Sequence, residues 1–265
     1  MLVLSREKPL WQINRRTLNV ELGLSEYRFP ETLIKGLIKS RPNRFIMMVE
    51  IDGVIEKCHC PSTGRIGNID FCDIPCLLSR SDSEKRKTNY TVEAIYPVSK
   101  SDTIVGINQV KANTYINFFL EHNLLPEMLL VETVKREVFL NTSKIDFLIN
   151  DNCYVEVKTL LKDIPFGIKK SDSKFTSFER LLRHYTEIST QINANQKSIV
   201  LLCNLFDAKP FAPPLNNATG TSQVRKVVKQ AIDNGIEHWQ INLKVTADGV
   251  SLIDYFKVDL LPNLK

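Results

Sequence analysis

The chain has 265 residues, of which 43% are hydrophobic and 25% are charged, and its formal net charge is +5. This composition is ordinary for a soluble globular protein, and no segment approaches the roughly 18–20 unbroken apolar residues of a transmembrane helix. The length suits one large domain or two modest ones, and the modest positive charge permits a polyanionic partner without requiring one.

The amino-terminal residues and the cysteines predict a cytoplasmic protein. Residues 1–9 have no basic start, no long apolar run and no cleavage site, so they do not resemble a signal peptide. Six cysteines in a chain of this length, without secretory features, suggest reduced thiols. Cys58-His59-Cys60 with Cys72 and Cys76 could be read as a zinc site. Because a Cys-x-Cys spacing is unusual for zinc knuckles, we expect buried thiols instead.

Residues 45–110 have the short, frequently interrupted apolar segments of a β-rich domain. Asp52-Gly53 is a strong hairpin-turn signal between the first two of these segments. The expected strands cover residues 45–51, 54–58, 74–79, 89–96 and 103–108. Because no amphipathic helix lies among them, they predict a small OB-like barrel. Because OB-like barrels commonly bind oligonucleotides, we expect an OB-like nucleic-acid-binding domain at residues 27–110, after an N-terminal extension of residues 1–26.

From residue 111 onward, helical and strand patterns alternate. Asn113 can cap a helix that ends near Leu125, and Thr176-Ser-Phe-Glu179 is a capping box that opens a second helix. A third helix is expected at residues 222–234, with Gly235 after its last turn. The expected strands cover residues 132–140, 144–149, 154–159, 198–203, 236–245 and 250–256. The fourth of these is apolar throughout, which is typical of a strand buried on both faces.

Two neighbouring strands of this second region carry ionisable residues in apolar surroundings. Asp146 interrupts the first strand, while Glu156 and Lys158 point to the same side of the second because side chains alternate along a strand. Burying such groups is costly unless they meet a cation or one another. Two carboxylates and an ammonium suit a divalent-metal site for phosphodiester hydrolysis. The carboxylates would bind Mg²⁺ or Mn²⁺, and the lysine would orient water or stabilise charge on phosphate.

Two simpler interpretations stay open from these residues. The strands could be solvated at an edge of the sheet, or Lys158 could form an internal ion pair with one carboxylate and no metal. Glu137, on the preceding strand, could add a metal ligand or hold a water molecule. As an isolated charge on a strand, it is as often solvated.

The arrangement of these charged residues resembles that of the PD-(D/E)XK nuclease superfamily. Asp146 is followed, after nine intervening residues, by Glu156-Val-Lys158, and the expected order of helix, three strands, helix and strand is similar to the core of that fold. The resemblance implies that Asp146, Glu156 and Lys158 are catalytic, and that Asp146 and Glu156, with Glu137, hold Mg²⁺ or Mn²⁺. The predicted fold class is α+β or α/β, with an N-terminal OB-like β-barrel followed by a PD-(D/E)XK nuclease-like mixed sheet flanked by helices, at residues 111–265.

Basic and aromatic residues on the barrel are candidates for nucleic-acid contacts. The cluster Lys85-Arg86-Lys87 is most simply a solvated loop, but on an OB-like barrel it can follow a nucleic-acid backbone. The turn Cys60-Pro-Ser-Thr-Gly64 offers hydroxyls and backbone amides to phosphate. Phe45 and Tyr90 of the barrel, and Tyr115 of the helix that follows, could stack on bases, but we expect them in the core.

A longer series of segments, taken in order, resembles the sugar fermentation stimulation protein A (SfsA) family from residue 27 to the C-terminus. It includes residues 60–64 (CPSTG), 85–93 (KRKTNYTVE), 112–113 (AN), 143–148 (SKIDFL), 154–160 (YVEVKTL) and 231–237 (AIDNGIE). The family pairs an OB-like domain with a PD-(D/E)XK domain and is described as DNA-binding, and its name suggests a regulatory role in sugar metabolism.

The chain also departs from the family pattern in two places. Ser62 stands where the family usually has asparagine, and residues 162–175 align poorly with the family's downstream motif. Arg180 and His184 can be matched with basic residues of that motif. The resemblance therefore makes Arg180 a candidate nucleic-acid-binding residue, while His184 is most simply a helix-surface residue.

We predict a DNA-binding protein with a divalent-metal-dependent nuclease site. The first alternative is a non-catalytic DNA-binding regulator of sugar metabolism that retains the fold, and the second is a protein-interaction scaffold. The sequence does not distinguish DNA from RNA as the partner. Because nucleases that cut both strands often pair up, it also leaves a homodimer open.

Overall fold

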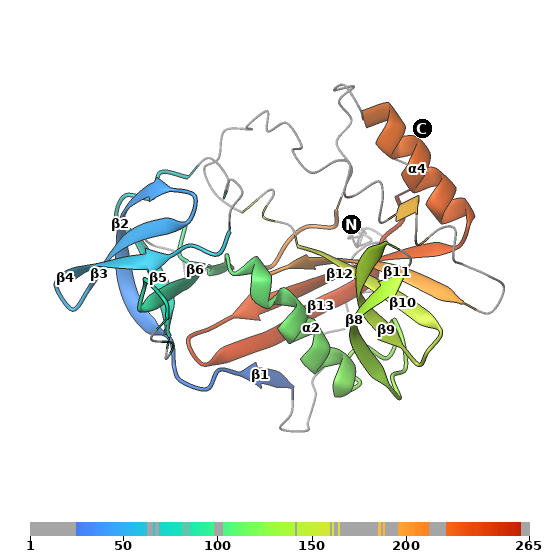
Figure 1. The fold of residues 1–265 in the computed structure, drawn as a ribbon, viewed down its shortest axis with the longest axis horizontal. Helices are drawn as coiled ribbons and strands as arrows, with labels where there is room; N and C mark the ends of the chain where they lie inside the picture. Colours follow the sequence, from blue (N-terminus) through green and yellow to red (C-terminus); the bar gives the residue numbers. More distant parts are fainter. Residues whose placement is uncertain are drawn as a thin grey trace, which may run out of the picture.

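In the computed structural model of the chain, a β-barrel and a larger mixed β-sheet lie side by side along the long axis of the molecule (Figure 1). The structure describes residues 25–62, 66, 69–81, 83, 85–97, 103–140, 142–159, 161, 164, 185–186, 188, 196–211 and 221–260, with only the backbone at 221–224. Within these residues, no helix has the length and apolar character needed to cross a membrane.

The barrel is the OB-like element that the sequence predicts. Its strands are β2 (Ile34–Asn43), β3 (Ile46–Ile51), β4 (Val54–His59), β5 (Ile74–Arg80), β6 (Tyr90–Ile95) and β7 (Val105–Gly106). The sheet order is β4-β3-β2-β5-β6-β7, and a further pairing of β4 with β6 closes five of the strands into a ring. Asp52 and Gly53, both with positive φ, form the predicted tight turn between β3 and β4.

The longest barrel strand, β2, has no counterpart among the predicted strands. Its sequence contains Gly36 and Pro42, which are both poor strand formers, and its burial does not alternate cleanly. Gly36 is needed for packing, because a Cβ atom there would lie 2.6 Å from Val49 Cγ1 and 2.8 Å from Leu78 Cδ1. The side chains of Val49 and Leu78 therefore occupy the space that a Cβ atom on residue 36 would need.

The cysteines of the barrel are mostly core residues. Cys58, Cys60 and Cys76 are buried in its apolar interior, and burial raises the pKa of the Cys58 and Cys76 thiols to about 12. Cys153 and Cys203 are buried in the second sheet, whereas Cys72 is exposed. The expectation of buried thiols for Cys58, Cys60, Cys72 and Cys76 thus holds for three of the four and is wrong for Cys72.

The second sheet has seven strands in the order β1-β13-β12-β11-β10-β9-β8. These are β1 (Glu26–Arg28), β8 (Val134–Leu140), β9 (Ser143–Ile149), β10 (Cys153–Thr159), β11 (Lys197–Asn204), β12 (Ile236–Val245) and β13 (Gly249–Lys257). Strands β10, β11 and β12 are parallel, and the other pairs are antiparallel. The sheet is therefore mixed, as predicted.

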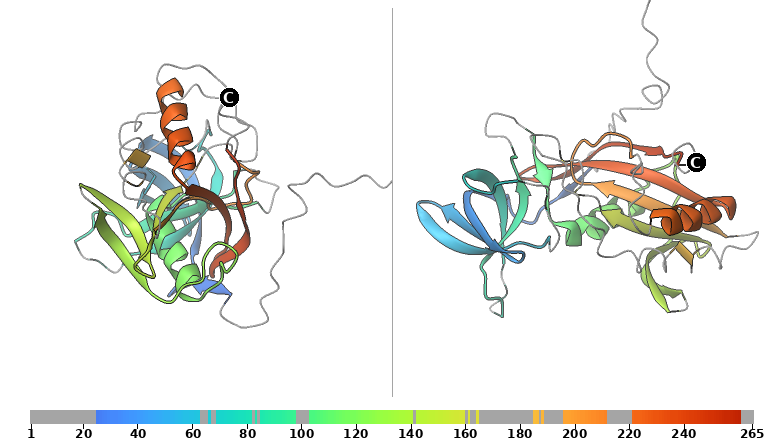
Figure 2. Two further views of the ribbon diagram at one scale, coloured as in Figure 1. Left: turned by 90° about the vertical axis from the view of Figure 1, so that its right-hand side faces the viewer. Right: turned by 90° about the horizontal axis from the view of Figure 1, so that it is seen from above.

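Helices cover both faces of this sheet. The helix α2 (Ala112–Glu121) packs in the same apolar cluster as Ile199 and Leu201 of β11, whereas α4 (Thr221–Asp233) packs in the cluster that contains Val200 and Leu202. Figure 2 shows the two helices on opposite sides of the strands. Strand β11 is thus buried on both faces, as its continuous apolar sequence predicts, and Gly235 follows α4 with a φ of 93°.

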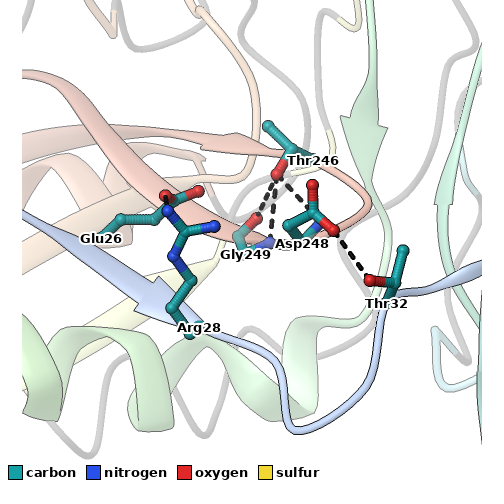
Figure 3. Close-up of polar contacts among 6 residues, drawn as sticks. All are labelled: Glu26, Arg28, Thr32, Thr246, Asp248 and Gly249. Atoms are coloured by element: carbon teal, nitrogen blue, oxygen red, sulfur yellow. Dashed lines mark hydrogen bonds and ion pairs between the residues drawn. The ribbon is translucent and has the colours of Figure 1, made fainter.

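The predicted boundary at residue 27 does not match the strand pairing. It divides β1, whose residues pair with β13 of the second sheet rather than with the barrel. The link that follows β1 then contacts the turn between β12 and β13, where Phe29 N donates to Asp248 O and Thr32 Oγ1 donates to Asp248 Oδ1 at 2.9 Å (Figure 3). A Cβ atom on Gly249 would lie 2.3 Å from Tyr27 O, so only glycine allows this close approach.

Two predicted helical features differ from the structure or fall outside it. Asn113 does not cap α2, because the cap position is Lys111 and it makes no side-chain cap hydrogen bond. The predicted second helix lies outside the described residues except for 185, 186 and 188. Of these, Tyr185 and Ile188 are buried in the same cluster as α4.

Candidate functional site

The three predicted catalytic residues lie on two strands that are direct neighbours. Asp146 is on β9, and Glu156 and Lys158 are on β10. The antiparallel pairing of these strands ends at Phe147 and Val155, so Asp146 and Glu156 are the next residues in line. Beyond the Phe147–Val155 pair, the contact between β9 and β10 is made by the Asp146 side chain, whose Oδ2 accepts a hydrogen bond from Val157 N at 2.7 Å. The carboxylate of Asp146 is therefore bound to β10 between Glu156 and Lys158.

Asn113 holds the other oxygen of Asp146. Its Nδ2 donates to Asp146 Oδ1 at 2.7 Å from the first turn of α2. Both oxygens of the carboxylate thus accept a hydrogen bond, which fixes the orientation of the side chain. Sequence reasoning treats Asn113 as a helix cap. The only signal for a wider role is the Ala112-Asn113 pair within the family resemblance.

Glu156 is buried and forms an ion pair with Lys158. Its side chain is 4% exposed, that of Lys158 is 23% exposed, and Lys158 Nζ lies 2.5 Å from Glu156 Oε1. The Lys158 ammonium thus contacts a buried carboxylate, while part of the lysine side chain is exposed to solvent. A charge-assisted contact of this kind is among the stronger hydrogen bonds in proteins.

The two carboxylates influence each other electrostatically. The pKa of Asp146 is raised, first because burial disfavours its ionised form and then because Glu156 carries a like charge nearby. The hydrogen bonds from Val157 N and Asn113, and the positive charge of Lys158, act in the opposite direction. The structure therefore brings Asp146, Glu156 and Lys158 into one electrostatically coupled group.

Glu137 does not join this group. It lies on β8 opposite Asp146, but these two residues are not paired although the register is the same on both sides of them, and the φ of Glu137 is 55°. Its side chain is 61% exposed, and its Oε2 lies 2.6 Å from Lys144 Nζ, which lowers the pKa of Glu137. Among the residues that the structure describes, no set of three His, Cys, Asp or Glu side chains is placed to hold a metal ion.

The predicted basic residues are only partly described. Lys85, Arg86 and Lys87 are exposed on the loop before β6, and Arg86 Nη2 donates to Thr91 Oγ1 at 2.9 Å. Arg180 and His184 lie outside the described residues. The cluster on the barrel is therefore placed on the surface, and Arg86 lies against the start of β6.

The turn that begins at Cys60 lies between the barrel and the end of β10. Ser62 is buried, and its Oγ donates to Ile107 O at 2.5 Å, so this hydroxyl serves the fold and is not presented to a ligand. Gln109 is adjacent to Ser62 Oγ and also reaches Thr159 O, at 3.4 Å in each case. Since Thr159 follows Lys158, the turn is next to the strand end that carries the charged group.

Comparison with family models divides the chain in the same way as the two sheets. Residues 40–107 match the SfsA N-terminal OB domain, and residues 110–249 match the sugar fermentation stimulation protein RE domain. The first match covers most of the barrel, and the second covers most of the mixed sheet.

Individual relatives cover most of the chain. A sugar fermentation stimulation protein homolog from Picosynechococcus sp. is 31% identical over 84% of this chain and 90% of its own length. A homolog of the same name from Maricaulis maris is 32% identical over 66% of this chain and 74% of its own length. A solved structure, Pyrococcus furiosus SfsA in complex with Ca²⁺, has a TM-score of 0.70 at 19% identity and covers 89% of this chain and 99% of that one. By the extent of these matches, the chain belongs to the sugar fermentation stimulation protein (SfsA) family.

Proposed function

We propose that the protein binds nucleic acid, with DNA as the first candidate, and hydrolyses its phosphodiester bonds with the help of a divalent metal ion. The observation that carries this proposal is the coupled group of Asp146, Glu156 and Lys158 at the end of the β9–β10 pairing. Two carboxylates and a lysine at this place also agree with the PD-(D/E)XK resemblance of the sequence. The OB-like barrel supports the nucleic-acid part of the proposal.

The residues fit a hard divalent cation. Both acidic groups offer carboxylate oxygens, and each Asp146 oxygen keeps a further lone pair after accepting its hydrogen bond. A cation would also relieve the repulsion that raises the pKa of Asp146. Mg²⁺ is commonly held by one or two carboxylates, with water and phosphate oxygens completing its sphere, so a third protein carboxylate such as Glu137 is not required. The related structure from Pyrococcus furiosus is in complex with Ca²⁺, another oxygen-binding cation.

Each residue of the group has a separate role in this proposal. Asp146 and Glu156 would hold the metal ion, and the ion would supply Lewis-acid stabilisation of the phosphate. Asn113 and Val157 N keep Asp146 in position, so that little reorganisation is needed during the reaction. Lys158, with its partly exposed head, donates to a phosphate oxygen or orients the attacking water.

One observation favours a second function. The ion pair between Lys158 and Glu156 neutralises a buried carboxylate without any metal. A DNA-binding regulator that retains the fold but does no chemistry would have the same pair. In that case, replacing Asp146 would leave nucleic-acid affinity unchanged or raise it, because a negative charge is removed from the binding surface.

The deciding experiment compares the wild type with Asp146→Asn on labelled single-stranded, duplex and flapped DNA, and on RNA, with Mg²⁺ or Mn²⁺. We expect the wild type to cleave at least one of these substrates and the variant to be slower by roughly 100-fold or more, the scale of losing one electrostatic group at a reaction centre. Glu137→Gln is the matched control, and it should cleave at the wild-type rate. Equal rates for Asp146→Asn and the wild type would refute the site, and no wild-type cleavage under any condition would favour the regulator.

A further inference from the structure

The turn between β2 and β3 presents an aromatic ring and an arginine to solvent. The Phe45 side chain is 42% exposed although the sequence predicts a core position, and the Arg44 guanidinium lies over its ring at 4.6 Å from the centroid. An exposed ring with a cation on one face is a surface onto which flat, electron-rich groups can stack. We call these two residues the Arg44–Phe45 platform.

The platform is held firmly by its neighbours. Arg41 Nη2 donates to Arg44 O at 3.1 Å and to Ser62 O at 2.8 Å. Phe45 N donates to Asn43 Oδ1 at 2.9 Å, and Phe45 O accepts a hydrogen bond from Cys60 N at 2.7 Å. Because the backbone is fixed on both sides of the ring, its exposure belongs to the folded architecture of the turn.

The exposed basic cluster lies at the same end of the barrel. Ile46, the residue after Phe45, pairs with His59, and His59 pairs with Thr91. Thr91 in turn accepts the hydrogen bond from Arg86. The positive charge of Arg86 contributes, after burial, to the lowered pKa of His59, as expected for neighbouring groups. The platform is thus flanked by cations that suit a polyanion.

A short series of contacts connects the platform to the candidate active site. Phe45 O accepts a hydrogen bond from Cys60 N, and Ser62 lies two residues later in the same turn. Gln109 then contacts both Ser62 Oγ and Thr159 O at the end of β10. Lys158 precedes Thr159. These contacts connect the turn that carries Phe45 with the end of β10 that carries the charged group.

We propose that the Arg44–Phe45 platform stacks on an unpaired base, so that the protein binds single-stranded nucleic acid and acts on substrates with a single-stranded part. Every base has a flat face that can stack on phenylalanine, whereas paired bases inside a duplex already stack on one another and offer only their edges. Arg44 of the platform and the basic cluster Lys85-Arg86-Lys87 would contact the phosphates of the bound strand. This inference rests on the nucleic-acid binding of the proposed function, and the binding preference does not depend on the hydrolytic step.

The test measures binding without cleavage. Fluorescence anisotropy in EDTA compares a labelled 20-nucleotide oligothymidine with a 20-base-pair duplex, using the full chain as wild type and as Phe45→Ala. We expect the wild type to bind the single strand more tightly, and the variant to lose about 5- to 100-fold in single-strand affinity, the range of one base–aromatic stack. Duplex affinity should change by less than about twofold, because phosphate contacts remain.

Two further variants separate stacking from general surface effects. Phe45→Trp should keep single-strand affinity, because it retains an aromatic face. Phe139→Ala removes another exposed phenylalanine, 72% exposed on β8, and should bind like the wild type. Unchanged single-strand binding in Phe45→Ala, or a wild type that prefers duplex, would overturn the inference even if the protein cleaves DNA. If single-strand binding depends on Phe45 but no substrate is cut, the platform stands and the hydrolase proposal falls.

Discussion

At the scale of single residues, the position of Asp146 depends on a partner from a distant element. Asp146 and Val157 belong to the same hairpin, and their contact follows from the short turn that fixes the register. Asn113 comes from α2, 33 positions earlier, and reaches the opposite oxygen. A carboxylate restrained from both sides should present a constant geometry to a cation.

Replacing Asn113 by alanine should weaken metal binding without unfolding the protein. Loss of its hydrogen bond removes a group that favours the ionised form of Asp146, so the pKa of Asp146 should rise further. We expect Mn²⁺ affinity, measured by isothermal titration calorimetry at pH 7, to fall by about 10-fold, as for other outer-shell partners. Asn152→Ala, on the exposed turn of the same hairpin, is the control and should bind Mn²⁺ normally. Equal affinities for Asn113→Ala and the wild type would contradict this role.

The charged group was predictable from sequence, and its surroundings were not. Alternation along strands and a short turn are local properties, so they place Asp146, Glu156 and Lys158 together. Glu137 stands opposite Asp146 in an unbroken β8–β9 register, yet it has a positive φ and the two residues are not paired, and no pattern in the sequence indicates that backbone change. The exposure of Phe45 likewise depends on how the barrel closes, because hydrophobicity alone does not say which residues a closing sheet leaves outside.

At the scale of elements, strands with clear turns were predicted well, and β2 was not. Its glycine and lysines do not form a strand pattern, and it is stabilised by pairing with β3 and β5 on either side. The tertiary setting of a strand can therefore override its local propensity. Helix α4 shows the opposite case, because its amphipathic pattern and its terminal glycine both agree with the structure.

A buried contact joins β12 to the segment that contains Tyr185. Tyr185 Oη lies 2.9 Å from His238 Nε2, and the two rings are stacked with centroids 5.7 Å apart. Burial lowers the pKa of His238 from 6.5 to about 4, so the folded protein keeps this imidazole neutral while the unfolded chain takes up a proton. The stabilising contribution is present above pH 6.5 and is lost as the pH falls toward 4.

This linkage predicts an acid sensitivity that can be measured. A shift of this size corresponds to about 3 kcal/mol in the free energy of unfolding between pH 6.5 and 4, of which about 2 kcal/mol should appear by pH 5. Urea unfolding at pH 7 and pH 5 should show that loss in the wild type and a smaller one in His238→Gln. The exposed His122→Gln is the control and should follow the wild type. An identical pH dependence in all three proteins would rule out His238 as the source.

At the scale of the whole molecule, a buried polar network around Glu93 of β6 joins the barrel to the start of helix α2, which packs on the second sheet. Its carboxylate accepts hydrogen bonds from Ser79 Oγ, Asn108 Nδ2 and Lys111 Nζ at 2.5, 2.7 and 2.8 Å, and its side chain is 1% exposed. Lys111 occupies the cap position of α2, the helix that carries Asn113. The same network therefore connects the barrel with the helix that orients Asp146.

Glu93→Ala should destabilise the protein by about 2–4 kcal/mol, because it leaves buried hydrogen-bond donors and one lysine without their shared acceptor. The measurement is the free energy of unfolding in urea at pH 7. Glu50→Ala is the control, since Glu50 forms a more exposed ion pair with Lys39 at 3.7 Å, and it should change stability by less than about 1 kcal/mol. Equal effects of the two substitutions would show that the Glu93 network stabilises the protein no more than an exposed ion pair does.

The pairing of β1 with β13 has a consequence for the order of events during synthesis. Residues 26–28 leave the ribosome before any barrel strand, yet their partners are residues 249–251. The barrel can complete its ring from residues 34–95 while β1 still lacks its neighbour. Of the strands that the structure describes, the one made first is thus unable to pair until residues 249–251 have been made.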